Sequence, residues 1–154
     1  MTQIFVQPDV CADNAEEVIR ILSESLYEAD MVKEGFAEAV VERERNYPTG
    51  LPTAEMAIAI PHADPNYVIR GALSVAKLKQ PVIFQQMGEP EKEIAVNLVI
   101  LMAVSDPTSQ LPMISNVINM FSNSEIIENI KHSDDPKQLY QIFQRSINNQ
   151  SADL

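Results

Sequence analysis

The stretch MAIAIPH, residues 56–62, decides the fold that the rest of the sequence supports. The run 56–60 is short and continuously apolar, which is typical of a strand covered on both faces. Pro61 ends the run, and His62 follows at once. Because a strand buried on both faces needs a layer of helices on each side of its sheet, the stretch predicts an α/β fold.

More strands are predicted downstream. Residues 73–78 and 82–86 are two short apolar segments separated by KQP, and they predict a strand pair with a tight connection. The polar stretch MGEPEKE, residues 87–93, is predicted to be a loop. It leads into the apolar run 94–104, which predicts a second buried strand. The middle of the chain therefore holds three or four strands.

Helices are predicted before these strands. Apolar residues recur at helical spacing over about residues 14–29, and Asp13 with Glu16 predicts a capping-box variant at the start. A second helix begins near Phe36. It stops before YPTG, residues 47–50, because the residue that precedes a proline avoids helical geometry. YPTG itself is predicted to be a turn.

Three more helices are predicted after the last strand. The first begins at Gln110 with Ser109 as its N-cap, because Pro112 is tolerated only in the first helical turn. A short helix is capped by Ser124. The last opens at Asp135, which is followed by a proline suited to the first helical position.

The element order predicts a single-domain mixed β-sheet flanked by helices on both sides, which is an α/β architecture. A chain of 154 residues is long enough for one ordinary globular domain. We expect residues 1–147 to form that domain and residues 148–154 to form a tail.

Charge and composition exclude several classes of function. The formal net charge of −11 argues against nucleic-acid binding, which needs clustered Lys and Arg, and against an anionic membrane surface. The run 94–104 is too short to cross a bilayer, so no membrane insertion is expected. Cys11 is the only cysteine, which excludes an intramolecular disulfide, and no secretory signal is visible at the start. We therefore expect a cytoplasmic protein.

Three residues are candidates for a phosphoryl-binding site. His62 follows a buried strand, at the sheet edge where functional groups gather in open α/β folds. If the two buried strands are neighbours, a helix N-terminus with Gln110 opens beside it, and such a terminus favours an anion. Arg43 lies just before the turn that leads to the His62 strand, and a guanidinium can bind two phosphoryl oxygens at once.

Each of these residues also has an ordinary interpretation. A lone histidine in a loop is more often structural, Arg43 can be part of a solvated helix face, and Gln110 can be a simple helix-start residue. His132 is expected only to interact with the dipole of a helix end. No glycine-rich nucleotide loop, no HExxH and no ordinary zinc site is present in the sequence, so we expect neither cofactor nor metal.

The stretch ERERNYPTGLPTAEMAIAIPHAD, residues 42–64, resembles the active-site signature of the fructose/mannitol-type (type 2) enzyme IIA of the bacterial phosphoenolpyruvate-dependent sugar phosphotransferase system. The resemblance extends over about the whole chain. It implies a phosphotransferase in which His62 is phosphorylated, through Nε2, and Arg43 lies near the phosphoryl group. It also implies that HPr is the phosphodonor and that a cysteine of a cognate enzyme IIB, which works with a membrane IIC, is the acceptor.

Departures from the mannitol and fructose pattern point to one branch of this family. Ala63 and Asp64 follow Pro-His where many members have glycine, and Gln110 stands where they have a second histidine. These features resemble the galactitol-specific IIA branch, which implies uptake of galactitol or a related polyol and a possible hydrogen bond from Gln110 to the phosphoryl group. A mannitol- or fructose-type IIA, a regulatory IIA homologue and a non-catalytic α/β binding module are the alternatives.

Overall fold

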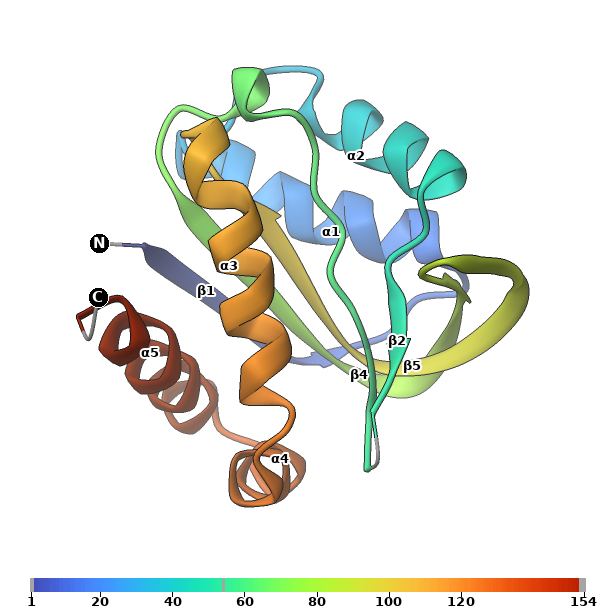
Figure 1. Cartoon of the computed structure of the whole chain (residues 1–154), viewed down its shortest axis with the longest axis vertical. Helices are drawn as coiled ribbons and strands as arrows, with labels where there is room; N and C mark the ends of the chain where they lie inside the picture. The colour runs from blue at the N-terminus through green and yellow to red at the C-terminus, as the bar shows by residue number, and fades with distance from the viewer. Residues whose placement is uncertain (1, 54, 153–154) are drawn as a thin grey trace.

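A long β-hairpin forms the middle of the sheet in the computed structural model, which describes residues 2–53 and 55–152, with side chains as far as Ile147 (Figure 1). Its strands, β4 (Ala72–Gln86) and β5 (Glu89–Ala103), pair antiparallel from Ala72↔Ala103 to Gln86↔Glu89. Strand β1 (Gln3–Val10) pairs parallel with β4.

Two short strands complete the five-stranded sheet. Strand β3 (Ala57–Ala59) lies parallel to β5, and β2 (Gly50–Pro52) lies antiparallel to β3. Strand β2 also meets the end of β4 at the pair Gly50↔Gln86, and the Met87 amide donates a hydrogen bond to the Gly50 carbonyl over 2.8 Å. The hairpin therefore bends until its turn reaches β2.

Helices cover both faces of the sheet, as predicted (Figure 1). Helices α1 (Ala15–Glu28) and α2 (Phe36–Asn46) lie on one face. Helices α3 (Pro107–Met120), α4 (Ser124–Lys131) and α5 (Pro136–Ala152) lie on the other. A short 3-10 turn, η1 (Pro65–Tyr67), connects the end of the β3 segment to β4.

Strands β3 and β5 contribute to both apolar cores, as a strand covered on both faces must. The core under α1 and α2 includes Leu22, Val40, Ala59, Phe84 and Val99, whereas the core under α3, α4 and α5 includes Ile58, Ile60, Leu98, Ile100 and Phe143. Ile58, Ala59 and Ile60 are completely buried. The prediction that the run 56–60 contains a strand covered on both faces is therefore confirmed.

Several predicted strand boundaries were wrong. Strand β1 was not predicted, because it is an edge strand that contains Pro8 and its register shifts between Gln7 and Val10, so it lacks a clear alternating pattern. The predicted tight connection at residues 79–81 is instead part of one continuous strand, β4, whose register shift between Lys77 and Val82 accommodates Pro81.

The predicted loop at residues 87–93 is only a tight turn in the structure. Gly88 adopts φ +79° there, and β5 begins at Glu89. The polar residues that suggested a loop lie on an exposed part of the strand instead. The predicted turn YPTG also ends early, because Gly50 already belongs to β2.

Four helix ends also differ from prediction. Helices α1, α3 and α4 are capped by Asn14, Asp106 and Asn123 rather than by the predicted residues. In α3, Pro112 lies inside the helix. Because proline has no N–H, the Thr108 carbonyl loses its helical hydrogen bond. Thr108 is exposed, so water can solvate that carbonyl. Helix α5 opens at Asp135, as predicted, but continues to Ala152, beyond the predicted start of the tail; residues 153–154 lie outside the described part. The domain boundary at residue 147 stays a prediction.

The close approach of β2 to β4 predicts a strong effect of Gly50→Ala. A Cβ at position 50 would lie 2.5 Å from the Gln85 carbonyl oxygen, a backbone atom that cannot move without disturbing β4. We expect a loss of about 1–3 kcal/mol in the free energy of unfolding, measured with urea. Gly71→Ala is the control, because its Cβ would find its nearest neighbour at 3.8 Å. Equal effects of the two substitutions would contradict this account.

Candidate functional site

His62 lies at the edge of the sheet where β3 and β5 end, as the sequence predicts. The parallel pairing of β3 with β5 continues beyond β3 as a bridge between His62 and Met102. The Met102 amide donates to the Pro61 carbonyl over 2.9 Å. The backbone on the N-terminal side of His62 is therefore held by a buried strand.

The His62 ring has a defined tautomer. Its Nδ1 lies 2.9 Å from the Ile60 carbonyl oxygen, which can only accept a hydrogen bond, so Nδ1 carries the proton and Nε2 keeps its lone pair. The residue is only 6% exposed. Burial lowers the pKa of His62 below its ordinary value, and the charge of Arg43 lowers it further, although the hydrogen bond to Ile60 opposes both effects. A neutral imidazole with a free Nε2 is a nucleophile at neutral pH.

Arg43 lies in the last turn of α2 and is not paired with its acidic neighbours. Its guanidinium carbon lies 5.4 Å from the centre of the Tyr47 ring. Among the described residues, no carboxylate forms an ion pair with it: Glu44 turns inward, and the neighbouring Arg45 binds Glu16. Arg43 is exposed on α2, as the interpretation of a solvated helix face expects, and the role of its unpaired guanidinium stays a prediction.

An open surface hollow of about 450 Å³ lies next to the His62 loop. Arg43 of α2 and its C-cap Tyr47 line one part of it, and Ala63, Asp64 and Tyr67 line another. The hollow therefore brings the unpaired guanidinium together with the residue that directly follows His62.

Gln110 also contacts the His62 loop, although the helix that carries it begins earlier than predicted. Its side-chain amide donates to the Ala63 carbonyl over 3.1 Å. The predicted anion site at the helix N-terminus is wrong, because the Asp106 carboxylate already accepts from the Thr108 amide over 3.0 Å. Gln110 therefore holds the loop with one N–H and keeps a second N–H that can donate elsewhere.

Two residues that the sequence analysis did not single out, Glu44 and Thr49, lie beneath the site. The two carboxylate oxygens of Glu44 accept from the Thr49 hydroxyl over 2.8 Å and from the Thr49 amide over 2.7 Å. Thr49 is buried, and its hydroxyl oxygen accepts from the Ile60 amide over 3.1 Å. The sequence contained one signal for this pair, which is a glutamate a few residues before Pro-Thr. The charge of that glutamate suggested a solvent-exposed position instead.

The pKa of Glu44 is raised to about 7, chiefly because burial disfavours the carboxylate. The two hydrogen bonds from Thr49 and the charge of Arg43 oppose this rise. Glu44 also lines a second open hollow, separate from the one beside Arg43, together with Glu16 of α1, Arg45 and Gln85 of β4, which does not titrate.

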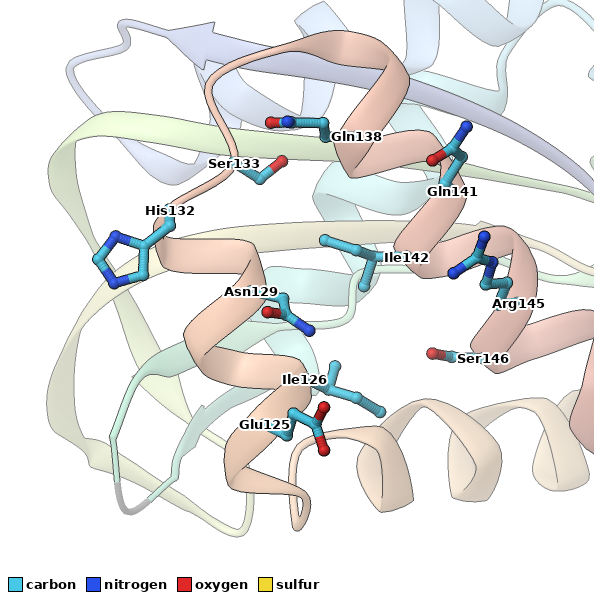
Figure 2. A pocket seen from close by; sticks show the side chains of 10 residues that line it. All are labelled: Glu125, Ile126, Asn129, His132, Ser133, Gln138, Gln141, Ile142, Arg145 and Ser146. Atoms are coloured by element: carbon cyan, nitrogen blue, oxygen red, sulfur yellow. The ribbon is translucent and has the colours of Figure 1, made fainter.

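The second histidine lies in a different place. Figure 2 shows an open groove of about 490 Å³ between α4 and α5, lined by His132, Ser133, Gln138 and Arg145 among others. His132 is the C-cap of α4, and its Nε2 lies 3.0 Å from a Glu128 carboxylate oxygen, in keeping with the predicted role at a helix end. No residue of the His62 site lines this groove.

The described part of the chain also lacks two other features. No group of three or more His, Cys, Asp or Glu side chains there is arranged to hold a metal ion. No helix within residues 2–53 and 55–152 combines the length and the apolar character needed to cross a membrane.

Comparisons with known proteins identify the family. Residues 1–146 match the family described as phosphoenolpyruvate-dependent sugar phosphotransferase system, EIIA 2. The galactitol-specific EIIA component of Escherichia coli strain K12 is 27% identical over 130 residues, which cover 84% of this chain and 86% of that protein. The chain therefore belongs to the type 2 enzyme IIA family, whose members are phosphotransferases that carry a phosphoryl group on a histidine.

Solved structures of the same system share the fold. Enzyme IIA for mannitol from Escherichia coli, solved in complex with phosphorylated enzyme IIB, superposes with a TM-score of 0.70 at 23% identity over 91% of this chain and 92% of that one. The nitrogen regulatory protein IIA-Ntr from Neisseria meningitidis superposes with a TM-score of 0.67 at 20% identity over 91% and 92% of the two chains. The predicted architecture is therefore confirmed.

The raised pKa of Glu44 predicts a pH-dependent stability that Glu44→Gln removes. The folded protein holds the Glu44 proton more tightly than the unfolded chain, so this contribution is complete below about pH 4.5 and is lost as the pH rises through about 7. Relative to Glu44→Gln, we expect the wild type to lose on the order of 3 kcal/mol of unfolding free energy across that window.

Urea unfolding of both proteins at several pH values measures this difference. The lowered pKa of His62 acts in the opposite sense, but it is present in both proteins and cancels. Glu42→Gln, which changes an exposed carboxylate of the same helix, is the control. A difference between wild type and Glu44→Gln that stays constant with pH would show that the Glu44 pKa is not raised.

Proposed function

We propose that this chain is a phosphocarrier of a sugar phosphotransferase system in which His62 accepts a phosphoryl group from phospho-HPr and passes it to a cysteine of a cognate enzyme IIB. The observation that carries the proposal is the His62 tautomer. Because Nδ1 is held by the Ile60 carbonyl, Nε2 is left as the nucleophile. The lowered pKa keeps that nitrogen unprotonated at neutral pH.

The proposed phosphoryl transfer does not require a metal ion. The Nε2 lone pair attacks the phosphorus of the donor phosphohistidine, a new N–P bond forms, and the old one breaks with its electron pair left on the donor ring. The proton stays on Nδ1, where the Ile60 carbonyl stabilises the positive charge that develops on the imidazole. In the second step a thiolate of enzyme IIB attacks the same phosphorus, and the N–P electron pair returns to Nε2. Positioning and charge stabilisation supply most of the catalysis in such transfers.

Arg43 and Gln110 are proposed to bind the phosphoryl oxygens. The Arg43 charge already acts on His62, and no carboxylate among the residues that the structure describes holds its guanidinium, which can therefore form two parallel hydrogen bonds to the transferred group. Gln110 lies on the other side of the loop, where its second amide N–H can donate to another oxygen.

The similarity to a galactitol-specific component supports galactitol or a related polyol as the transported substrate. The mannitol IIA that was solved with phosphorylated IIB supports the choice of a IIB partner. The formal net charge of −11 suits attraction to a basic face on the donor, and we place the protein in the cytoplasm with its partners. A regulatory role, of the kind named in the nitrogen regulatory relative, is the alternative; transfer from His62 to enzyme IIB separates the two.

Intact mass after incubation with phosphoenolpyruvate, enzyme I and HPr tests the acceptor. We expect the wild type to gain one acid-labile phosphoryl group and His62→Ala to gain none. His132→Ala is the matched control and should gain the group as the wild type does, because His132 lies outside the site. Absence of any gain in the wild type, with HPr shown to be phosphorylated, would contradict the proposal.

Substitution of Arg43 tests its role. Arg43→Gln should lower the rate of phosphoryl uptake on the order of a hundredfold, since it removes a donor that acts on charge in the transition state. Arg45→Gln is the control, because it removes an equal charge from the same helix turn but from a residue that is paired with Glu16. Equal losses in the two variants, measured by rapid quench, would mean that only the overall charge matters.

A further inference from the structure

A chain of hydrogen bonds, partly buried at Glu44 and buried at Ile60, connects α2 to the His62 ring. It runs from the Glu44 carboxylate to the Thr49 hydroxyl over 2.8 Å, from Thr49 to the Ile60 amide over 3.1 Å, and from the Ile60 carbonyl to His62 Nδ1 over 2.9 Å. Thr49 is 3% exposed and Ile60 is completely buried. Water is therefore poorly placed to replace the two bonds made by Ile60, and loss of the Thr49 hydroxyl leaves the buried Ile60 amide unsatisfied. The bond between Glu44 and Thr49 is only partly buried.

The chain fixes the carbonyl that selects the His62 tautomer. The Ile60 amide is anchored by Thr49, and the next carbonyl along, that of Pro61, is anchored by the Met102 amide at 2.9 Å. The Ile60 carbonyl lies between these two anchors. Its direction, and hence its bond to Nδ1, depends on both.

Glu44 in turn fixes the Thr49 hydroxyl. Above its raised pKa of about 7 the Glu44 carboxylate is ionised and can only accept, so the Thr49 hydroxyl proton points to Glu44 and its lone pairs remain for the Ile60 amide. The second bond, from the Thr49 amide to Glu44, holds the backbone of the same residue.

We propose that Glu44, acting through Thr49 and Ile60, is a positioning residue that holds His62 in the tautomer with Nδ1 protonated and Nε2 free. The inference rests on the proposed function, in which Nε2 takes the phosphoryl group. One turn of α2 then carries two roles: Arg43 lines the surface hollow beside the His62 loop, and Glu44 binds Thr49. The alternative is that Glu44 and Thr49 only stabilise the connection between α2 and β2. Their loss would then lower the free energy of unfolding but leave the tautomer of His62 unchanged.

Nitrogen-15 NMR of the imidazoles separates these alternatives without any phosphoryl transfer. The chain has only two histidines, so His132, which is exposed, serves as an internal reference in every spectrum. At about pH 8, above the raised pKa of Glu44 and the lowered pKa of His62, the wild type should show His62 protonated at Nδ1. Thr49→Val should shift His62 toward a mixture of tautomers, whereas Thr49→Ser, which keeps the hydroxyl, should not.

Ser74→Ala is the matched control for lost stability. The Ser74 hydroxyl is also buried and donates to a backbone group, the Leu22 carbonyl of α1 at 3.2 Å, rather than to the chain of bonds that leads to His62. It should lower stability and leave the His62 tautomer unchanged. A tautomer that is unchanged in Thr49→Val, in protein shown by its spectrum to be folded, would overturn the inference.

Glu44→Ala and the double variant Glu44→Ala/Thr49→Val test whether the two residues act as one unit. Each single variant should lower the rate of phosphoryl uptake about tenfold, and the double variant should lose no more than the larger single effect, because both remove the same connection. Additive losses would overturn the connection through Thr49. If the wild type takes up no phosphoryl group but its tautomer still responds to Thr49→Val, the positioning stands and the proposed function fails.

Discussion

The site depends on the burial of β3 between two layers of helices. This strand spans only Ala57–Ala59, so its few backbone hydrogen bonds do not hold it alone. Ile58 and Ile60 enter the core under α3 and α5, and Ala59 enters the core under α1. Pairing with β5 sets its register, and the chain leaves the sheet at Pro61 with His62 next to Met102. The position of the histidine is thus a consequence of apolar packing on both faces.

The electrostatics of the site are local and opposed to those of the whole chain. With a formal net charge of −11, the protein repels a phosphoryl group at long range. In the proposed function Arg43 offsets this repulsion beside His62, because no carboxylate of the described residues forms an ion pair with its guanidinium and its charge reaches His62. The inward turn of Glu44 contributes to the same result, since it removes a competing carboxylate from the surface beside Arg43.

The local pattern of the sequence was sufficient for the parts of the fold that rest on apolar runs. The covered strands, the flanking helices, and the approach of Gln110 to the loop after His62 all follow from such runs and from the adjacency of two parallel strands. Strand β1 and the unbroken β4 were missed, because their prolines are accommodated at an edge and at a register shift that only pairing with other strands reveals. Glu44 and Thr49 were missed for a related reason. The bond from the Ile60 amide to the Thr49 hydroxyl joins the residue after β3 to the residue before β2, which only the pairing of these strands brings together, and charge alone suggested a solvated glutamate.

The central claim is that His62 carries the phosphoryl group on Nε2 because Nδ1 is held by the Ile60 carbonyl. Phosphorus-31 NMR of the phosphorylated protein, labelled with nitrogen-15 at its histidines, tests this most directly through the one-bond coupling between phosphorus and nitrogen. The account predicts a single phosphohistidine whose phosphorus couples to Nε2 of His62. Coupling to Nδ1, or a phosphoryl group on His132, would contradict it.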